Sequence, residues 1–388
     1  MDTSELTSAA FWQSKQCQTM VNARDAEAVR EAGLLGSWSR LHPELSGHLL
    51  FATSGSSGGR KWVALSRDAL LASAAIVNQH LSAGANDRWL MALPEFHVGG
   101  MGILARCYNA GSELVKLGGK WSPELYHRTA DSEDVSLSSL VPTQLYDLVQ
   151  RGLRAPKSLR ALMIGGGRLG DGVYEQAMKL GWPVMETYGM TETCSQVATA
   201  SLGGRDLMVL PGWQTKLSDR DCLSIKGDSL FTGYVTCSGN VCELVDPKQE
   251  GWFTSEDVVK HVDNKIWVKG RVDRCVKILG ELVNLSEVEA KVEAKLESSE
   301  KFKQLAGNIA VVALPDSRKG YQLILCSEES SDLDQICKHY NVDSHPVERL
   351  EGICVVSEIP RSPLGKVRHG LLASKVTDQL KQMKQNDR

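Results

Sequence analysis

The densest group of side chains suited to chemistry lies in the segment "FATSGSSGGRKW" at residues 51–62. Between Thr53 and Lys61 the segment holds four hydroxyl side chains, three glycines and two cations. A glycine-rich turn after a strand can bind phosphate through its backbone N–H groups. The spacing is not that of a Walker A loop, because Arg60 occupies the position of the second glycine. Taken alone, the segment fits a flexible loop as well as an anion-binding loop.

A second group occurs in "ETYGMTETCSQVAT" at residues 186–199, where Thr191, Glu192 and Thr193 follow a Tyr-Gly pair. Mg²⁺ prefers one or two carboxylates together with phosphate oxygens and water. Hydroxyl groups beside a single carboxylate therefore fit a magnesium–phosphate site. A polar loop that caps a helix is the alternative, and in isolation it is the more common use of such residues.

Asp257 and Arg271 flank a predicted hairpin in "GWFTSEDVVKHVDNKIWVKGRVDR". A carboxylate there can accept hydrogen bonds from both ribose hydroxyls, whereas the alternative is a structural ion pair. Lys366 follows two prolines and a glycine in "IPRSPLGKVRH", although most single lysines are solvated surface residues. His97 precedes two glycines in "LPEFHVGGMG", where it either gates a binding site or completes a core.

The elements that must position these residues are short apolar runs that alternate with helix-like stretches from about residue 48 to 200. Each run ends at Gly, Pro or Ser, and helical periodicity follows at 66–81 and 142–153. Such alternation predicts an α/β fold with a mainly parallel sheet, in which ligands bind beyond the carboxyl ends of the strands. The polar clusters lie at those ends, at residues 53–59, 97–102, 165–167 and 187–195.

The pattern of predicted secondary structure changes twice after residue 200. Residues 203–270 contain short strands and turns, which predict a small β-rich subdomain. From residue 273 onward Ser286 and Glu289 suggest a capping box that opens an amphipathic helix. Strand-like runs and a Lys-rich helical tail from about 367 complete an α+β pattern. We therefore expect a large N-terminal domain over 1–272 and a small C-terminal domain over 273–388.

Composition excludes several classes of protein. The 388 residues carry a net charge of −3, which argues against nucleic-acid binding through a basic surface. No apolar run is long enough to span a membrane, and the N-terminus lacks the apolar core of a secretory signal. The ten cysteines are scattered singly with no metal-ligand spacing, so we expect free thiols in a cytoplasmic protein.

The order of the motifs is more specific than any one of them. The serine/glycine loop is followed by F-H-x-x-G, G-G-G, Y-G-M-T-E-T, W-F-x-x-x-D, G-R-x-D and P-R-x-x-x-G-K. This series resembles the adenylate-forming superfamily of acyl-CoA synthetases over residues 48–369. Within that superfamily, "YGMTETCSQVAT" and the short length look most like the o-succinylbenzoate–CoA ligases of menaquinone biosynthesis.

The resemblance implies ATP, Mg²⁺ and coenzyme A as cofactors and a small carboxylic acid as substrate, with acyl-adenylate as the intermediate. Lys366, Thr191, Glu192 and His97 would be catalytic, with Glu192 also holding Mg²⁺. Asp273 would be the hinge of a moving C-terminal lid, and Gly280 would approach CoA. ATP would be bound by Thr53, Ser54, Gly55, Ser56, Ser57, Gly58, Lys61, Gly165, Gly166, Gly167, Tyr188, Gly189, Asp257 and Arg271.

The acid would face His97, Thr193, Ser195 and Gln196. A second carboxylate, as in o-succinylbenzoate, needs a cation or several hydrogen-bond donors. Arg106 and Arg168 are candidates for that cation, although we expect both on the surface. Two other functions stay open: a ligase of fatty or other acids, and a non-catalytic nucleotide-binding relative. A stand-alone amino-acid-activating domain fits less well, since no carrier domain follows.

Three features depart from the superfamily pattern. Arg60 stands where proline or an apolar residue is usual, and Glu256 stands where glycine is common. A carboxylate beside Asp257 is expected to weaken nucleotide binding. Only about 50 residues precede the serine/glycine loop, so the resemblance implies that much of the first N-terminal subdomain is absent or reduced. The sequence does not determine an oligomeric state, and a homo-oligomer is compatible with it.

Overall fold

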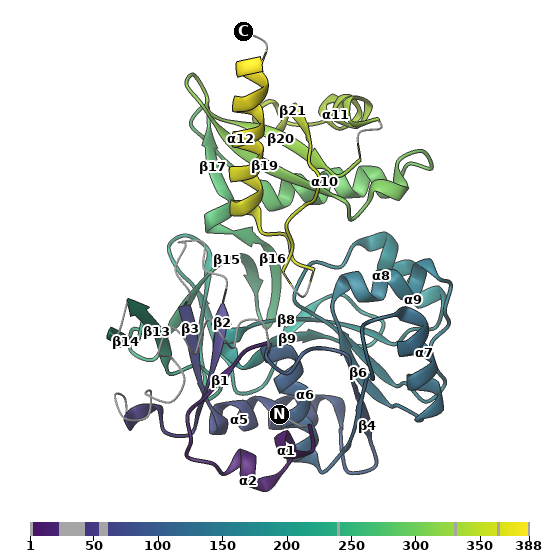
Figure 1. Cartoon of the computed structure of the whole chain (residues 1–388), viewed down its shortest axis with the longest axis vertical. Coiled ribbons are helices and arrows are strands. Elements are labelled where there is room, and N and C mark those ends of the chain that lie inside the picture. The colour runs from purple at the N-terminus through teal and green to yellow at the C-terminus, as the bar shows by residue number, and fades with distance from the viewer. Residues whose placement is uncertain are drawn as a thin grey trace.

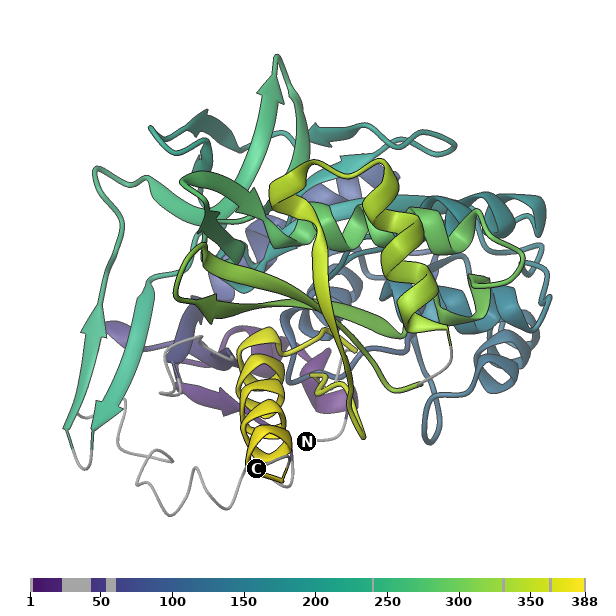
Figure 2. The ribbon, with the colours of Figure 1, turned by 90° about the horizontal axis from the view of Figure 1, so that it is seen from above.

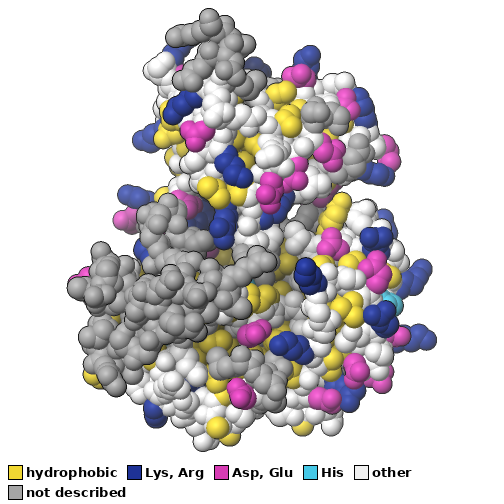
Figure 3. Space-filling view, viewed as in Figure 1, with side chains coloured by type: hydrophobic (Ala, Val, Ile, Leu, Met, Phe, Trp, Pro, Cys, Tyr) yellow, Lys and Arg dark blue, Asp and Glu magenta, His cyan; other side chains and the backbone are white. Residues whose placement is uncertain are grey.

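A computed structural model describes residues 3–22, 43–53, 61–238, 241–329, 332–362 and 365–386. Five residues of the predicted ATP loop lie outside that part of the chain, namely Ser54, Gly55, Ser56, Ser57 and Gly58. The described residues form a large body, built from the chain up to Arg271, and a smaller lid, built from Cys275 onward (Figure 1). In the space-filling view of Figure 3, the outline of the molecule is narrower where these two parts meet.

The centre of the body is an eleven-stranded sheet in the order β11-β12-β15-β16-β10-β9-β8-β7-β6-β4-β5. Strands β5, β4, β6, β7 and β8 pair in parallel and are covered by helices on both faces. Side chains alternate between the faces: Trp89 and Met91 pack with α5 and α6, whereas Leu90 packs with α7 and α8. This half of the sheet confirms the predicted α/β class.

The bounds of these elements agree with the apolar runs and the helical stretches of the sequence. The elements are α5 (Arg67–Leu81), β4 (Arg88–Met91), α6 (Val98–Ala110), β5 (Glu113–Lys116), α7 (Pro123–Ser132), β6 (Leu137–Leu140), α8 (Pro142–Gln150), β7 (Ala161–Ile164), α9 (Asp171–Lys179) and β8 (Val184–Met190).

The other half of the sheet is antiparallel, so the mainly parallel character stops at β8. Short connections join β9 to β10, β11 to β12 and β15 to β16, and such connections link antiparallel neighbours. Between β12 and β15 the chain leaves this sheet to form β13 and β14 of a second sheet. These strands are β9 (Ser195–Ala200), β10 (Leu207–Val209), β11 (Gln214–Leu217), β12 (Cys222–Lys226), β15 (Phe253–Val262) and β16 (Lys265–Arg271).

A second sheet of five strands has the order β1-β2-β3-β13-β14. It includes a strand that the sequence did not predict, between the serine/glycine loop and the helix expected at 66–81. Strand β3 comes first and pairs antiparallel with β2, so the loop joins the two strands of a hairpin. Seen from above, the β13–β14 end of this sheet projects beyond the lid (Figure 2). The strands are β1 (Gln18–Met20), β2 (His48–Thr53), β3 (Lys61–Ser66), β13 (Gly233–Ser238) and β14 (Val241–Val245).

The N-terminal helices α1 (Thr3–Leu6) and α2 (Ala9–Trp12) pack on the body next to β1. Trp12 stacks on Tyr108 of α6 with ring centroids 5.8 Å apart. Arg67 lies over the Phe11 ring and donates to the carbonyl of Gln16 at 2.8 Å. These contacts fix residues 3–20 to the same core as the parallel strands.

The lid is a three-stranded sheet, β19-β20-β21, with helices on both faces. Val288, Val292 and Leu296 form the buried stripe of α10, as their spacing predicts, and α12 covers the opposite face. The lid contains β17 (Cys275–Ile278), β18 (Glu281–Asn284), α10 (Leu285–Glu297), β19 (Ile309–Asp316), β20 (Gly320–Ser327), α11 (Leu333–Val342), β21 (Leu350–Val355) and α12 (His369–Asn386).

The start of α10 differs from the prediction. Its N-cap is Asn284, whose side chain accepts a hydrogen bond from the backbone N–H of Ser286 at 3.0 Å. Ser286 therefore lies inside the first turn, and Glu289 bonds to the N–H of Val311 instead of closing a capping box. Asparagine is as good an N-cap as serine, and it stands two residues earlier.

The three buried clusters of the body contain no residue of the lid, and the two buried clusters of the lid contain no residue of the body. The short 3₁₀-helix η3 (Val272–Arg274) connects the two parts. This packing supports a boundary near the predicted position between 272 and 273, which stays a prediction. In the described part of the chain, no helix has the length and apolarity needed to cross a membrane.

Candidate active site

The predicted ATP-binding turn Gly165–Gly167 lies at the carboxyl ends of β6 and β7, beside β8. Gly165 follows β7 and packs so tightly on Thr187 of β8 that a Cβ atom would lie 2.5 Å from the Thr187 Oγ1. Gly166 has a φ of +81°, which favours glycine, and Gly167 lies beside Pro142. The turn therefore lies at the edge of the sheet where ligands of α/β proteins bind.

Tyr188, Asp257 and Arg271 form one cluster, although they come from three strands. The Tyr188 hydroxyl donates to Asp257 Oδ2 at 2.7 Å, and Arg271 Nη1 lies 3.7 Å from Asp257 Oδ1. Asp257 and Arg271 are direct partners across the β15–β16 hairpin, as the sequence predicted. Tyr188 and Gly189, however, belong to strand β8 rather than to a turn.

Gly189 is required there by a close approach of two strands. A Cβ atom on Gly189 would lie 1.6 Å from the backbone oxygen of Ser195 on β9. The absence of a side chain lets β8 and β9 pair tightly just before the Thr191–Thr193 turn.

Arg271 also pairs with Glu256 and with Asp273, whose Oδ1 lies 3.0 Å from the Arg271 Nε. Burial by itself lowers the pKa of Arg271, but the carboxylates of Asp273, Asp257 and Glu256 together raise it above its ordinary value. The guanidinium thus stays charged, and Glu256 is an ion-pair partner rather than an isolated negative charge beside Asp257.

Thr191, Glu192 and Thr193 form the 3₁₀-helix η2 at the end of β8. Thr193 is fully buried and anchors the turn, since its Oγ1 accepts a hydrogen bond from the Met190 N–H at 3.1 Å. Glu192 accepts a hydrogen bond from the Tyr234 hydroxyl at 2.9 Å, and burial raises the pKa of its carboxyl group.

The donor set suits Mg²⁺ that arrives with a nucleotide. Among the described residues no group of three or more His, Cys, Asp and Glu side chains could hold a metal ion alone. A single buried carboxylate is disfavoured as an anion, so a nearby cation would stabilise it. Mg²⁺ commonly takes its remaining ligands from phosphate and water. Thr191 and Glu192 therefore fit the ion only if phosphate oxygens complete its coordination.

The stretch from Thr193 to Gln196 lies against Arg106, which α6 carries into the interior. The Arg106 side chain is 2% exposed, lies over the Trp89 ring and donates from Nη2 to Ser195 Oγ at 3.2 Å. Our expectation of a surface position is wrong for Arg106, because its helix faces β9 here. It is right for Arg168, which is exposed.

Arg106 is a buried cation with an incomplete set of partners. Its Nε is buried without a hydrogen bond, and no carboxylate pairs with it in the described part of the chain. Burial lowers its pKa to about 10, so it stays positive at neutral pH. A buried unpaired charge is costly, and an anion bound beside Ser195 would relieve that cost.

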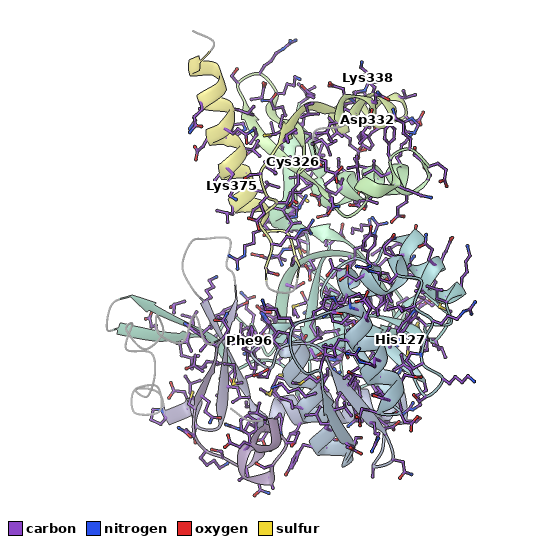
Figure 4. All side chains as sticks on the ribbon, turned by 45° about the vertical axis from the view of Figure 1, so that its right-hand side comes forward. Phe96, His127, Cys326, Asp332, Lys338 and Lys375 are labelled. Carbon is purple, nitrogen blue, oxygen red and sulfur yellow. The ribbon has the colours of Figure 1, made fainter. Side chains whose placement is uncertain are left out.

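His97 stands at the N-terminus of α6, next to Phe96 with ring centroids 4.8 Å apart. Its Nε2 is buried without a partner among the described residues, and burial lowers the pKa of the ring. Figure 4 places Phe96 within the body and Cys326 and Lys375 in the lid. His97 is therefore a neutral, unsatisfied donor or acceptor inside the body.

The two predicted lysines differ in position. Lys61 begins β3 and its Nζ lies 5.2 Å from the centroid of the Tyr234 ring. Lys366 is exposed and follows Gly365, at which a Cβ atom would lie 3.0 Å from Thr143 Oγ1. The lysine loop therefore touches the body at the start of α8, beside the Gly165–Gly167 turn.

Of the remaining predicted residues, Gly280 stands apart from this cluster, whereas Thr53 pairs with Lys61. Gly280 lies between β17 and β18 in the lid, and nothing comes within 4 Å of the position of its Cβ. Thr53 ends β2, directly opposite Lys61 in the hairpin register. The structure thus brings together the glycine turn, the Tyr188 cluster, Glu192, Arg106 and the Lys366 loop, but not Gly280.

Sequence reasoning missed three residues that organise this edge. Tyr234 bonds to Glu192. Arg205 joins Glu186 and Asp171 at 2.5 Å each and so fixes the segment after the glycine turn. Glu297 of the lid accepts a hydrogen bond from the Gly172 N–H at 3.2 Å. No sequence motif marks these three residues, because their partners are distant in the chain. Only Glu186, one of the two partners of Arg205, lies fewer than thirty positions away.

Comparison with known proteins gives one family and one fold. The sequence signature of the AMP-binding enzyme family matches residues 25–235. A 2-succinylbenzoate–CoA ligase of Bacillus licheniformis is 29% identical over 303 residues, which are 74% of this chain and 62% of that protein. The Escherichia coli ligase of the same name is 31% identical over 291 residues, 74% of this chain and 60% of that protein. The chain thus spans about three-fifths of the length of these relatives.

Solved structures with the same architecture include o-succinylbenzoate CoA synthetase from Bacillus subtilis in complex with ATP and magnesium ion. It has a TM-score of 0.69 and 25% identity, over 85% of this chain and 69% of that chain. ATP-bound MatB from Rhodopseudomonas palustris has a TM-score of 0.72 at 20% identity, over 84% of this chain and 67% of that chain, and shows the fold alone.

Proposed function

This chain belongs to the family of AMP-binding enzymes, and we propose that it is an ATP-dependent acid–CoA ligase whose acid is o-succinylbenzoate. In the first half-reaction a carboxylate oxygen of the acid attacks the α-phosphorus of ATP, and pyrophosphate leaves. In the second, the CoA thiol attacks the carbonyl of the acyl-adenylate, and AMP leaves as the thioester forms.

The nucleotide is held at the carboxyl edge of the large sheet. The Asp257 carboxylate accepts hydrogen bonds from the ribose hydroxyls, and Arg271 lies beside that carboxylate as its ion-pair partner. The turn Gly165–Gly167 and Tyr188 receive the adenine ring. Lys61 and the preceding loop hold the terminal phosphates, and Thr191 contacts the α-phosphate.

The charges at the reacting centre must be offset, because a carboxylate approaches a polyphosphate. Glu192 would help to hold Mg²⁺, which when bound would supply electrostatic stabilisation of the charge on the leaving pyrophosphate. Lys366 enters from the lid as a compact point charge on a flexible stem. The contact of its loop with Thr143 supports this role, since it brings the lysine to the same edge as the nucleotide. Rotation about Asp273 then withdraws it, and Gly280 approaches with CoA.

One observation carries the choice of acid: the buried guanidinium of Arg106 beside Ser195. An acid with a single carboxylate commits that group to the α-phosphorus and leaves Arg106 without a partner. A dicarboxylate has a second anion for Arg106, and an aromatic ring between the two groups fits the apolar neighbours of His97. A long-chain fatty acid would instead place hydrocarbon against a buried charge, which is costly.

ATP–pyrophosphate exchange with a panel of acids tests the proposal. We expect exchange with o-succinylbenzoate and little with benzoate or a long-chain fatty acid. Arg106→Met keeps the volume of the side chain but removes its charge. It should lower exchange with o-succinylbenzoate by ~10²-fold, the usual scale for losing a partner of a buried charge. Tyr108→Phe on the same helix is the matched control and should behave as wild type.

Three results would count against this assignment. Exchange with long-chain acids alone would identify a fatty-acid ligase. Exchange with o-succinylbenzoate that survives Arg106→Met would remove Arg106 from acid recognition. No exchange with any acid, although the protein binds ATP, would indicate a nucleotide-binding protein without ligase activity.

A further inference from the structure

Resting on the function proposed above, we propose that Tyr234 is a positioning residue that holds Glu192 and Lys61 in register for Mg²⁺–phosphate binding. Tyr234 lies on β13, beside the strand that resumes after the serine/glycine loop. In that pairing Tyr234 is opposite Val63 and Thr236 is opposite Lys61. The residue thus sits next to the downstream end of the loop that receives the phosphates.

The hydroxyl group of Tyr234 reaches across to the other sheet. It donates to Glu192 Oε1 at 2.9 Å, and the backbone of the same turn is held by the Phe231 N–H, which donates to the Glu192 carbonyl at 2.9 Å. Both bonds join the segment of β13 to the η2 turn. A carboxylate that accepts a phenol on one oxygen can still offer the other oxygen to a cation.

The aromatic ring of Tyr234 contacts its second partner, Lys61. Lys61 Nζ lies 5.2 Å from the ring centroid, within the range of a cation–π contact. Phe231 meets the ring edge-on at 4.9 Å, and Lys248 donates to the carbonyls of Phe231 and Thr232 at 2.8 and 2.9 Å. The side chain is therefore held by its own strand and by the preceding turn, independently of any ligand.

This arrangement solves a problem that the topology creates. Lys61 begins a strand of the five-stranded sheet, whereas Glu192 follows the last parallel strand of the eleven-stranded sheet. Mg²⁺ demands near-ideal octahedral geometry, so the carboxylate and the phosphates must keep a fixed separation. Tyr234 contacts Lys61 of the five-stranded sheet and Glu192 of the η2 turn, and it is placed to fix that separation.

Calorimetric titration of ATP, with and without Mg²⁺, tests this role without relying on turnover. Tyr234→Phe deletes only the hydroxyl group. We expect it to weaken Mg²⁺-dependent ATP binding by ~10-fold, about 1.4 kcal/mol, and to leave Mg²⁺-free ATP binding unchanged. Tyr234→Leu, which also removes the ring, should weaken Mg²⁺-free binding as well. Tyr108→Phe on α6, whose ring stacks on Trp12, is the control variant.

A double-mutant cycle separates positioning from general stability. If Tyr234 acts through Glu192, Tyr234→Phe should have no further effect in a Glu192→Gln background. Equal loss with and without Mg²⁺, or full additivity with Glu192→Gln, would overturn the role of Tyr234. A failure of the Tyr234→Phe protein to fold would also overturn it, as a purely structural effect. If the wild-type protein binds no ATP, the proposed function itself fails, which is a different result.

Discussion

Arg106 in the body and Lys366 in the lid are both assigned to anions, but the structure holds them in opposite ways. Arg106 lies on a helix inside the core, with its guanidinium fixed over Trp89 and bonded to Ser195. Lys366 lies exposed on a loop that meets the body through Gly365 and Thr143. A cation that selects a substrate must be preorganised, whereas one that acts in a single half-reaction must be able to leave.

The same contrast holds for the carboxylates. In the body, Asp257 and Glu192 are bonded to tyrosines that strands hold in place. On the lid, Glu293 and Glu297 lie on the side of α10 that approaches the body, near Arg168 and Gly172. In the proposed mechanism, the body would therefore fix the nucleotide geometry, and the lid would contribute contacts that are exchanged between two orientations.

The sharpest test of this contrast is Lys366→Ala. We expect adenylate formation to fall by ~10²–10³-fold, the scale for losing one electrostatic donor to a transition state. Thioester formation from supplied acyl-adenylate should be largely unchanged, because Lys366 is withdrawn at that stage. Rapid-quench measurement of each half-reaction checks the result, with Lys375→Ala on α12 as control. Equal losses in both half-reactions would mean that Lys366 does not act in adenylation alone.

The next largest expected effect is a dependence of protein stability on pH through Glu293 of the lid. Burial raises the pKa of Glu293 from its ordinary 4.5 to about 7, with opposition from the Gly307 N–H and Arg168 and further support from Glu297 and Glu289. Because the folded state binds this proton more tightly, unfolding becomes easier as the pH rises from 4.5 to about 7. Each unit of pKa shift is worth about 1.4 kcal/mol.

Glu293→Gln removes this titration but retains an acceptor for the Gly307 N–H. Its melting temperature relative to wild type should increase between pH 5 and pH 7 and then level off. Thermal melts across that range provide the measurement, and Glu300→Gln, an exposed neighbour, should show no such trend. A constant difference at every pH would show that Glu293 titrates normally.

The smallest expected effect is that of Glu297→Ala. Helix α9 has Gly170 as its N-cap and no side-chain cap of its own, so the lid supplies the carboxylate. Losing an N-terminal cap costs roughly 1 kcal/mol, which predicts a ~5-fold fall in adenylate formation. Thioester formation should be spared, and Glu297→Gln should restore part of the loss. An unchanged ratio of the two half-reactions would show that the contact does not hold the lid.

The sequence predicted those features that depend on neighbours along the chain. The parallel strands, the buried stripe of α10 and the pairing of Asp257 with Arg271 all follow from periodicity and from turn spacing. The hairpin at the serine/glycine loop was missed because "KWVALS" is short and runs straight into a helix. Pairing with β2 and β13 on both sides makes it a strand.

Features that depend on distant partners could not be predicted. The burial of Arg106 requires Ser195, which is 89 residues away, and a charge in the run "ILARCY" reads equally well as a solvated helix position. Tyr234 meets Glu192 only because two sheets pack together at that point. Tertiary contact, rather than local pattern, decides both cases.

The connection between body and lid is anchored very close to both of its ends. Arg271 is tied to Asp257 and Glu256 of the body, while Arg274 is tied to Glu289 of the lid at 3.1 Å. Only Val272 and Asp273 separate these anchors. A connection this short has few variable backbone torsions, so it allows a small number of defined orientations of the lid rather than free movement. Lengthening it by one residue would shift where the lid lands by ~3.5 Å, farther than any hydrogen bond tolerates.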